Sequence, residues 1–142
     1  MYKHRANHRI AKTKKDRNMT QMTVINTCEI INNAIVAHYI LGHQLRAAAI
    51  EQNRGLPVRL YKNAQKCGLG KLIDFLKKND QMTARAQEVD ALHVDLHDAA
   101  CGVAALIATG NFDAAIDELA TGYYADAAAA LTKALSHWKV EV

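Results

Sequence analysis

The scarcity of helix-breaking residues most constrains the fold of this chain. Pro57 is the only proline among 142 residues, and the chain contains only seven glycines. Alanine and leucine are abundant instead, and both favour helices. A sheet protein with many turns would need more of the residues that turns prefer. A hydrophobic fraction of 50% is enough for one buried core. We therefore expect a single all-α domain.

Apolar residues recur at helical spacing in several segments. The first runs from about Thr20 to Asn53 and stops before Gly55 and Pro57. The connector that follows includes at most a helical turn. Further helices are expected at 67–78, at 82–108 with Asp80 as its N-cap, and at 111–138 after Gly110. Short connections between these segments predict an antiparallel four-helix bundle with an extra short helix that carries Cys67.

The positive charge of the chain is concentrated at its N-terminus. Residues 1–17 hold seven Lys or Arg and one acidic residue, Asp16, whereas residues 18–142 hold 11 basic and 13 acidic residues, a net charge of −2. Residues 1–17 also include almost no apolar residues. We therefore expect 1–18 to be a basic, disordered tail and 19–142 to be the folded bundle. A basic arm that contacts nucleic acid or anionic lipid is the alternative for this tail.

The cysteine count and the hydropathy pattern indicate a reducing compartment. Cys28, Cys67 and Cys101 are odd in number, and the chain shows no export signal, so a disulfide framework is not expected. No run approaches the ~18 consecutive apolar residues of a membrane span. The sequence thus predicts a cytoplasmic protein with free thiols and no membrane span.

A pair of histidines in "ALHVDLHDAAC" points to metal binding. His93 and His97 are four residues apart, so on a helix they differ by about 40° in azimuth and can direct both imidazoles to one point. The pair alone is a weak signal, because two partly exposed histidines are the simpler interpretation. Residue 94 is Val rather than Glu, which argues against the zinc-protease pattern.

Two residues outside that helix could complete a site. His38 lies on the inward face of the first helix, where a histidine bonded to a core acceptor is the alternative. Cys67 begins the short helix, where backbone N–H groups favour a thiolate. Three imidazoles and one thiolate form a closed tetrahedral set, for which Zn²⁺ is the first choice.

The order of these elements resembles the chemoreceptor zinc-binding (CZB) domain family. That pattern is a first-helix His, a Cys-x-x-Gly-(Lys/Arg)-(Trp/Leu) element and a His-x-x-x-His helix, here His38 in "NNAIVAHY", Cys67 in "CGLGKL", and "LHVDLH". The spacing is most similar to the zinc-sensing domain at the N-terminus of a zinc-inhibited diguanylate cyclase. The resemblance covers about residues 24–138 and implies His38, Cys67, His93 and His97 as zinc ligands. Leu41 and Leu72 stand where many members have Trp.

The resemblance implies a function as well as a ligand set. We expect a zinc-binding regulatory or sensor domain of bacterial signal transduction, in chemotaxis or cyclic-di-GMP signalling, that works as a homodimer. Zinc occupancy or oxidation of the Cys67 thiolate would change how the helices pack. No output domain is recognisable in the chain, so its output is expected in a partner protein or in a domain outside this sequence.

Two other functions are the alternatives. A metal-dependent enzyme in a helical bundle is not expected, because the glutamates lack the Glu-x-x-His spacing of di-iron sites and a fourth protein ligand would close a zinc site. Nucleic-acid binding through the basic tail is also not expected, because the rest of the chain offers no second basic face.

Two further candidate residues are expected to lie outside the metal site. Cys101 is expected to be a buried apolar residue. His43 lies about 140° around the helix from His38, so it is expected not to share the same ion.

Overall fold

The computed structural model describes the backbone of residues 2–142 and the side chains of residues 26–65 and 67–142. Within the described backbone the chain is helical, with no strand, so the predicted all-α class is confirmed. Its elements are α1 (Tyr2–Ile50), α2 (Val58–Tyr61), the short 3-10 helix η1 (Ala64–Lys66), α3 (Gly68–Lys78), α4 (Ala84–Ala108), α5 (Phe112–Thr121) and α6 (Tyr123–Glu141).

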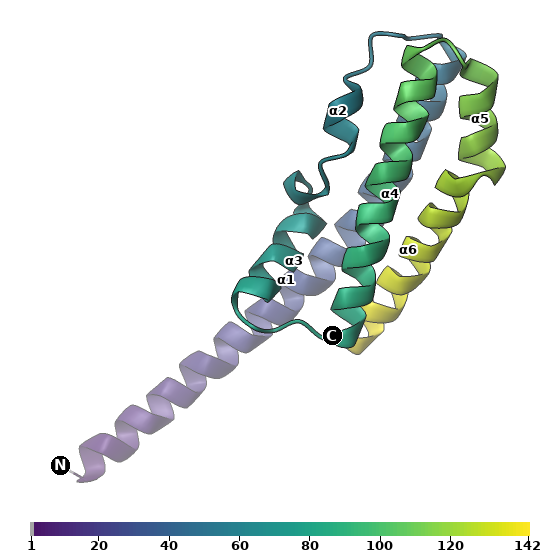
Figure 1. The fold of residues 1–142 in the computed structure, drawn as a ribbon. Coiled ribbons are helices and arrows are strands. Elements are labelled where there is room, and N and C mark those ends of the chain that lie inside the picture. The colour runs from purple at the N-terminus through teal and green to yellow at the C-terminus, as the bar shows by residue number, and fades with distance from the viewer. Residues whose placement is uncertain (1) are drawn as a thin grey trace.

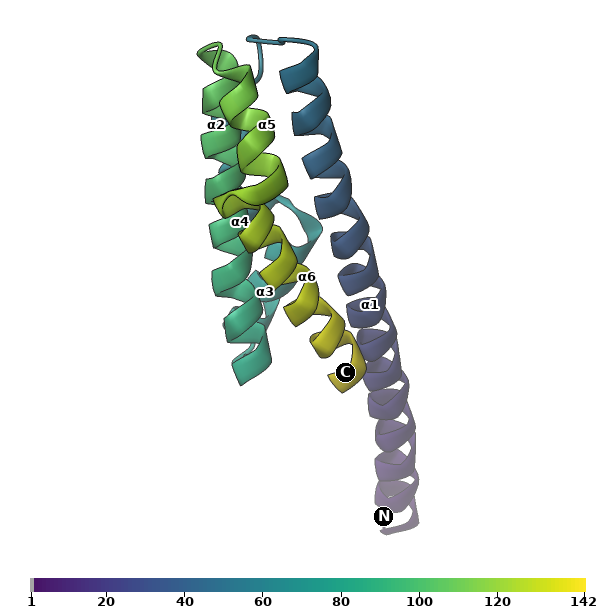
Figure 2. The ribbon, with the colours of Figure 1, turned by 90° about the vertical axis from the view of Figure 1, so that its right-hand side faces the viewer.

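The chain goes back and forth along one long axis (Figure 1). It rises along α1, returns through α2, η1 and α3, rises again along α4 and returns through α5 and α6. Figure 2 shows α5 and α6 facing α1, and α1 contacts both helices. The predicted four-helix arrangement itself stays a prediction, because three short elements take the place of one helix and α5 is separate from α6.

Helix α4 lies at the centre of the packing. It contacts α1, α2, α3, α5 and α6. Ten of the 23 buried apolar side chains in the described part of the chain are alanines, and such small residues let helix axes approach closely. Among the described residues, α4 is also the one helix long and apolar enough to cross a membrane by length and composition alone. Its central position in the core accounts for that composition, and the expected absence of a membrane span stays a prediction.

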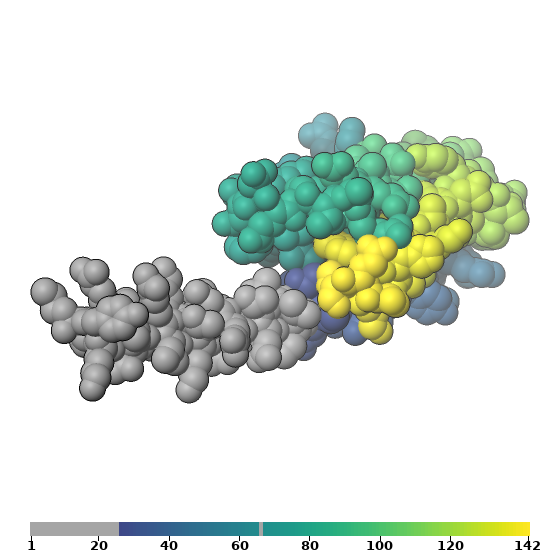
Figure 3. Space-filling view, turned by 90° about the horizontal axis from the view of Figure 1, so that it is seen from below, coloured from purple at the N-terminus to yellow at the C-terminus, as the bar shows by residue number. Residues whose placement is uncertain are grey.

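An ion-pair network joins the start of α4 to the end of α6. Arg85 near the start of α4 donates from Nη2 to Glu141 Oε1 at 2.8 Å and from Nη1 to Glu88 Oε2 at 2.9 Å. The end of α6, yellow in Figure 3, accordingly lies against the teal segment that contains the start of α4. These side chains are partly exposed, so the network aligns the helix ends more than it stabilises them.

Two predicted boundaries differ from the structure. The predicted first helix begins at Thr20, whereas α1 begins at Tyr2. The predicted tail of residues 1–18 lies outside the described side chains, so its disorder stays a prediction. The predicted N-cap Asp80 is wrong: it sits in the turn after α3 with φ 52°. Thr83 caps α4 instead, because its Oγ1 accepts from the backbone N–H of Ala86 at 3.1 Å.

The predicted helix over residues 111–138 is divided at Gly122. This residue has an extended backbone, with ψ −159°, and separates α5 from α6. The Glu118 carboxylate folds over the break and accepts from the backbone N–H of Tyr124 at 3.2 Å. A Cβ atom at position 122 would overlap the same carboxylate. The glutamate therefore caps α6 in place of a continuous helical turn.

Candidate metal centre

The histidine pair of α4 faces the interior, as its helical spacing predicts. His93 and His97 are only 1% and 8% exposed, and their ring centroids are 4.6 Å apart with nearly perpendicular planes. They lie on the core side of α4 because apolar residues at helical spacing, among them Val89, Leu96 and Ala100, are buried on the same side. Two buried imidazoles one turn apart can share one ion.

Two further elements bring the remaining donors to this pair. His38 comes from α1, and its Nε2 lies 3.4 Å from His97 Nε2. Cys67 is the residue that immediately precedes α3, and its Sγ lies 3.2 Å from His93 Nε2 and 3.9 Å from His38 Nε2. The four donor atoms all lie within 4.8 Å of one another. The structure therefore brings together the four residues that the sequence singles out.

Three of the six distances between donor atoms are close to those of a tetrahedral metal site. With bonds of about 2.05 Å to nitrogen and 2.3 Å to sulfur, a tetrahedron places two nitrogens about 3.3 Å apart and a nitrogen and a sulfur about 3.6 Å apart. The observed nitrogen pair at 3.4 Å matches the first value, and the sulfur distances of 3.2 and 3.9 Å lie on either side of the second. The group is thus positioned to bind a metal ion.

Backbone carbonyls set the orientation of two of the rings. His38 Nδ1 donates to the carbonyl oxygen of Ala34 at 2.6 Å, and His97 Nδ1 donates to that of Tyr61 at 2.8 Å. A proton on Nδ1 leaves the Nε2 lone pair of each ring free to face the ion. A core acceptor for His38 was expected only as the alternative to metal binding, without Ala34 being identified, and no acceptor was expected for His97. The carbonyl of Ala34 lies one turn before His38 on the same helix. The acceptor from α2 could not be predicted, because it is the backbone carbonyl of Tyr61 and no side chain in the sequence marks it.

Burial keeps the imidazoles in the form that binds metal. Burial lowers the pKa of His93 to about 3, with a smaller contribution from the nearby His97 and His38 rings. The pKa values of His38 and His97 are also lowered, chiefly by burial, although their hydrogen bonds to backbone carbonyls oppose the shift. Neutral rings are therefore the favoured state at neutral pH, as coordination requires.

These shifts predict a pH dependence for the metal-free protein. Because the pKa of His93 is about 3 in the folded state and near 6.5 when exposed, the unfolded chain binds more protons between these values. The free energy of unfolding should therefore fall as pH drops below 6.5, by up to about 1.4 kcal/mol per pH unit from this residue. Urea denaturation between pH 7 and 5 tests this, with the exposed His137 changed to Gln as control; no loss of stability over that range would contradict it.

A glycine positions the cysteine. A Cβ atom at Gly70 would overlap the carbonyl oxygen of Ala64, and its distance to Gln65 Cα would be 2.9 Å. Only glycine therefore lets η1 approach the first turn of α3 this closely. Cys67 lies between these two elements, so the direction of its side chain depends on this contact. The glycine of the Cys-x-x-Gly element has a steric role.

The other candidate residues lie outside the group. Cys101 is half-buried rather than buried as expected, and it does not belong to the donor cluster. His43 is exposed and packs against Tyr39, with ring centroids 4.6 Å apart. Leu72 is buried and Leu41 is partly buried against the core, which agrees with packing roles.

Solvent has a path to the donor atoms. A groove of about 360 Å³ between α1 and α3 is lined by Ala37, His38, Cys67 and His97 among others. The Cys67 side chain is itself only partly buried. An ion or a small oxidant can therefore reach the sulfur without unfolding of the helices.

Comparison of the chain with known protein families, with characterised proteins and with solved structures finds no match. The assignment of the centre therefore rests on its own geometry: three imidazoles and one thiol from α1, α4 and the start of α3 that converge on one point.

Proposed function

We propose that this protein is a zinc-binding regulatory domain of the chemoreceptor zinc-binding type. The observation that carries the proposal is the convergence of His38, Cys67, His93 and His97 with the spacing of a tetrahedral site. This set also has the order of the motif that the sequence shares with that family. One ion would join α1, α4 and the residue that precedes α3.

The donor chemistry favours zinc among divalent ions. Imidazole nitrogen and thiolate sulfur together suit a borderline-soft ion without a strong geometric preference, whereas magnesium and calcium prefer oxygen. Four protein donors complete a tetrahedral shell and leave no position for a substrate or an activated water. We therefore propose a regulatory rather than a catalytic role for the ion.

Regulation would act through helix packing. Because one ion would link three segments, its loss, or oxidation of the Cys67 sulfur, would release α1 and α3 from α4. The solvent-accessible groove beside Cys67 supports exchange and oxidation as signals. We further propose a cytoplasmic homodimer that transmits this change to a separate output protein or domain. The exposed apolar residues Val36 and Ile40 of α1 support a dimer, since they offer a surface for a second copy.

Metal analysis tests the proposal directly. Protein purified after zinc-replete expression should contain about one zinc per chain, and X-ray absorption should show three nitrogens and one sulfur at the bond lengths of a tetrahedral site. A zinc content near zero would contradict metal binding. A bound water in place of one protein donor would instead favour a catalytic centre.

A further inference from the structure

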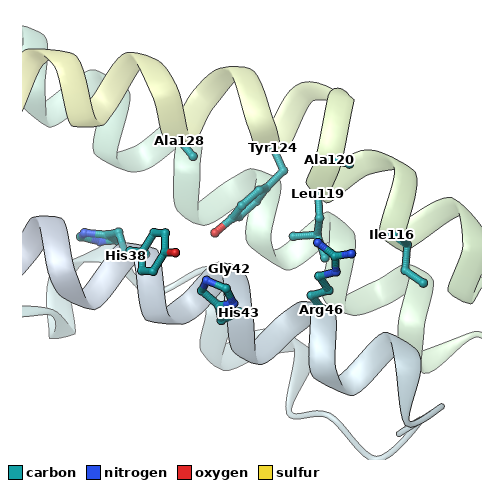
Figure 4. A pocket seen from close by; sticks show the side chains of 10 residues that line it. His38, Gly42, His43, Arg46, Ile116, Leu119, Ala120, Tyr124 and Ala128 are labelled. Carbon is teal, nitrogen blue, oxygen red and sulfur yellow. The ribbon is translucent and has the colours of Figure 1, made fainter.

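A second groove lies outside the metal centre, between α1 and the helices α5 and α6 (Figure 4). Its volume is about 200 Å³, which is below the usual range of about 300–1,000 Å³ for sites of drug-sized ligands. Its walls are mostly apolar, with Ile116 and Leu119 from α5 and Ala128 from α6. A small molecule with an apolar body would fit this space.

The hydroxyl of Tyr124 faces this groove without a partner. The side chain is only 4% exposed, and its oxygen is a buried polar atom with no hydrogen-bond partner in the described part of the chain. Figure 4 shows the ring extending from α6 toward α1, with the oxygen in the groove. Burial raises the pKa of Tyr124 to about 12, so the hydroxyl stays protonated and can donate. A buried donor without an acceptor is costly, so an acceptor is expected in the groove.

A glycine of α1 keeps the space beside that hydroxyl open. A Cβ atom at Gly42 would lie 3.2 Å from the Tyr124 oxygen and 3.6 Å from Cε1. Glycine is an unfavourable residue inside a helix, yet Gly42 lies within α1, about two turns before its end at Ile50. Any larger side chain at this position would crowd the donor.

A positive charge stands one helical turn beyond Gly42. Arg46 lines the same groove, and Figure 4 shows its guanidinium directed toward Leu119 on the opposite wall. The ion pairs recorded among the described residues do not include Arg46. Its charge is therefore available to a ligand. A guanidinium and a neutral hydroxyl donor in one groove with apolar walls are suited to a carboxylate rather than to a more highly charged phosphate.

We propose that this groove binds a small carboxylate with an apolar body, held by Arg46 and the Tyr124 hydroxyl and packed against Ile116 and Leu119. The proposal does not depend on the metal centre, although His38 borders both sites. The carboxylate would satisfy the buried donor and the unpaired guanidinium together.

Titration of the 142-residue protein with sodium benzoate and sodium 4-methylpentanoate, followed by amide NMR, tests the proposal. We expect saturable shifts at Gly42, Leu119 and Tyr124 with at least one carboxylate. The uncharged benzamide should bind at least about tenfold more weakly than benzoate, because a charge-assisted hydrogen bond is lost. Tyr124→Phe and Arg46→Gln should each weaken binding by a similar factor. Arg59→Gln, which removes an exposed arginine on α2, should leave binding unchanged.

Thermal unfolding separates binding from folding. Tyr124→Phe removes an unpaired buried hydroxyl, so its Tm without ligand should equal or exceed that of the parent. Three results would overturn the proposal: no saturable shifts in the groove with either carboxylate, equal affinity for benzamide and benzoate, or unchanged affinity in Tyr124→Phe. Amide chemical shifts of Gly42 and Tyr124 that change with protein concentration rather than with ligand concentration would also overturn it, because a second copy would then cover the groove.

Discussion

Replacing Cys67 with alanine is expected to weaken zinc binding by more than about a hundredfold. Changes to residues that only orient a ligand typically cost 10–100-fold in metal affinity, and Cys67 is a proposed ligand itself. Its sulfur lies 3.2 and 3.9 Å from two histidine nitrogens, so its loss would leave three neutral imidazoles and an open position. Competition with a chromophoric zinc chelator measures the dissociation constant.

The matched control is Cys101→Ala. Cys101 is a half-buried cysteine of α4 that does not belong to the donor group, so its replacement should leave the zinc dissociation constant unchanged within about twofold. Equal losses of affinity in the two variants would show that zinc binds elsewhere or that Cys67 acts only through stability.

Gly70→Ala is expected to have the second largest effect. The added Cβ would overlap the carbonyl oxygen of Ala64, and backbone atoms cannot move aside as the end of a flexible side chain can. Alanine would gain up to about 1 kcal/mol in helix propensity, but the overlap should cost about 1–3 kcal/mol. Displacement of η1 would also turn Cys67 away from His93. The free energy of unfolding should fall, and zinc affinity should fall more than tenfold.

Gly68→Ala supplies the comparison for this variant. Gly68 belongs to the same turn, but a Cβ there would meet nothing within 4 Å. Urea unfolding and zinc titration should therefore show little change, or a slight gain in stability from helix propensity. If Gly70→Ala were as stable as Gly68→Ala and bound zinc as tightly, the steric role of Gly70 would be refuted.

Much of the fold follows from local sequence signals. The near absence of proline and the apolar periodicity predict the all-α class, and the "LHVDLH" spacing predicts two imidazoles on one helix face. The meeting of His38 and Cys67 with that pair is different, because nothing local to either residue specifies it. Only the order of the three elements, compared with a known pattern, indicated that tertiary contact.

The predicted helix boundaries are wrong where a side chain bonds to the backbone of a residue several positions along the chain. Asp80 and Thr83 are both good N-cap residues, and the choice between them depended on where the turn after α3 ends. The break at Gly122 depends on the Glu118 carboxylate, which bonds to a backbone N–H six residues later. The groove beside Tyr124 was not foreseen, because its walls come from three helices and its donors form no motif.

The spacing of the ligands along the chain sets an order for capture of the ion. His93 and His97 are neighbours on one helix, whereas Cys67 is 26 residues before His93 and His38 is 29 residues before Cys67. An ion held by the helical pair closes no long loop, while each remaining bond must close a loop at an entropic cost that grows with its length. We expect the ion to be gathered first on α4 and last by α1.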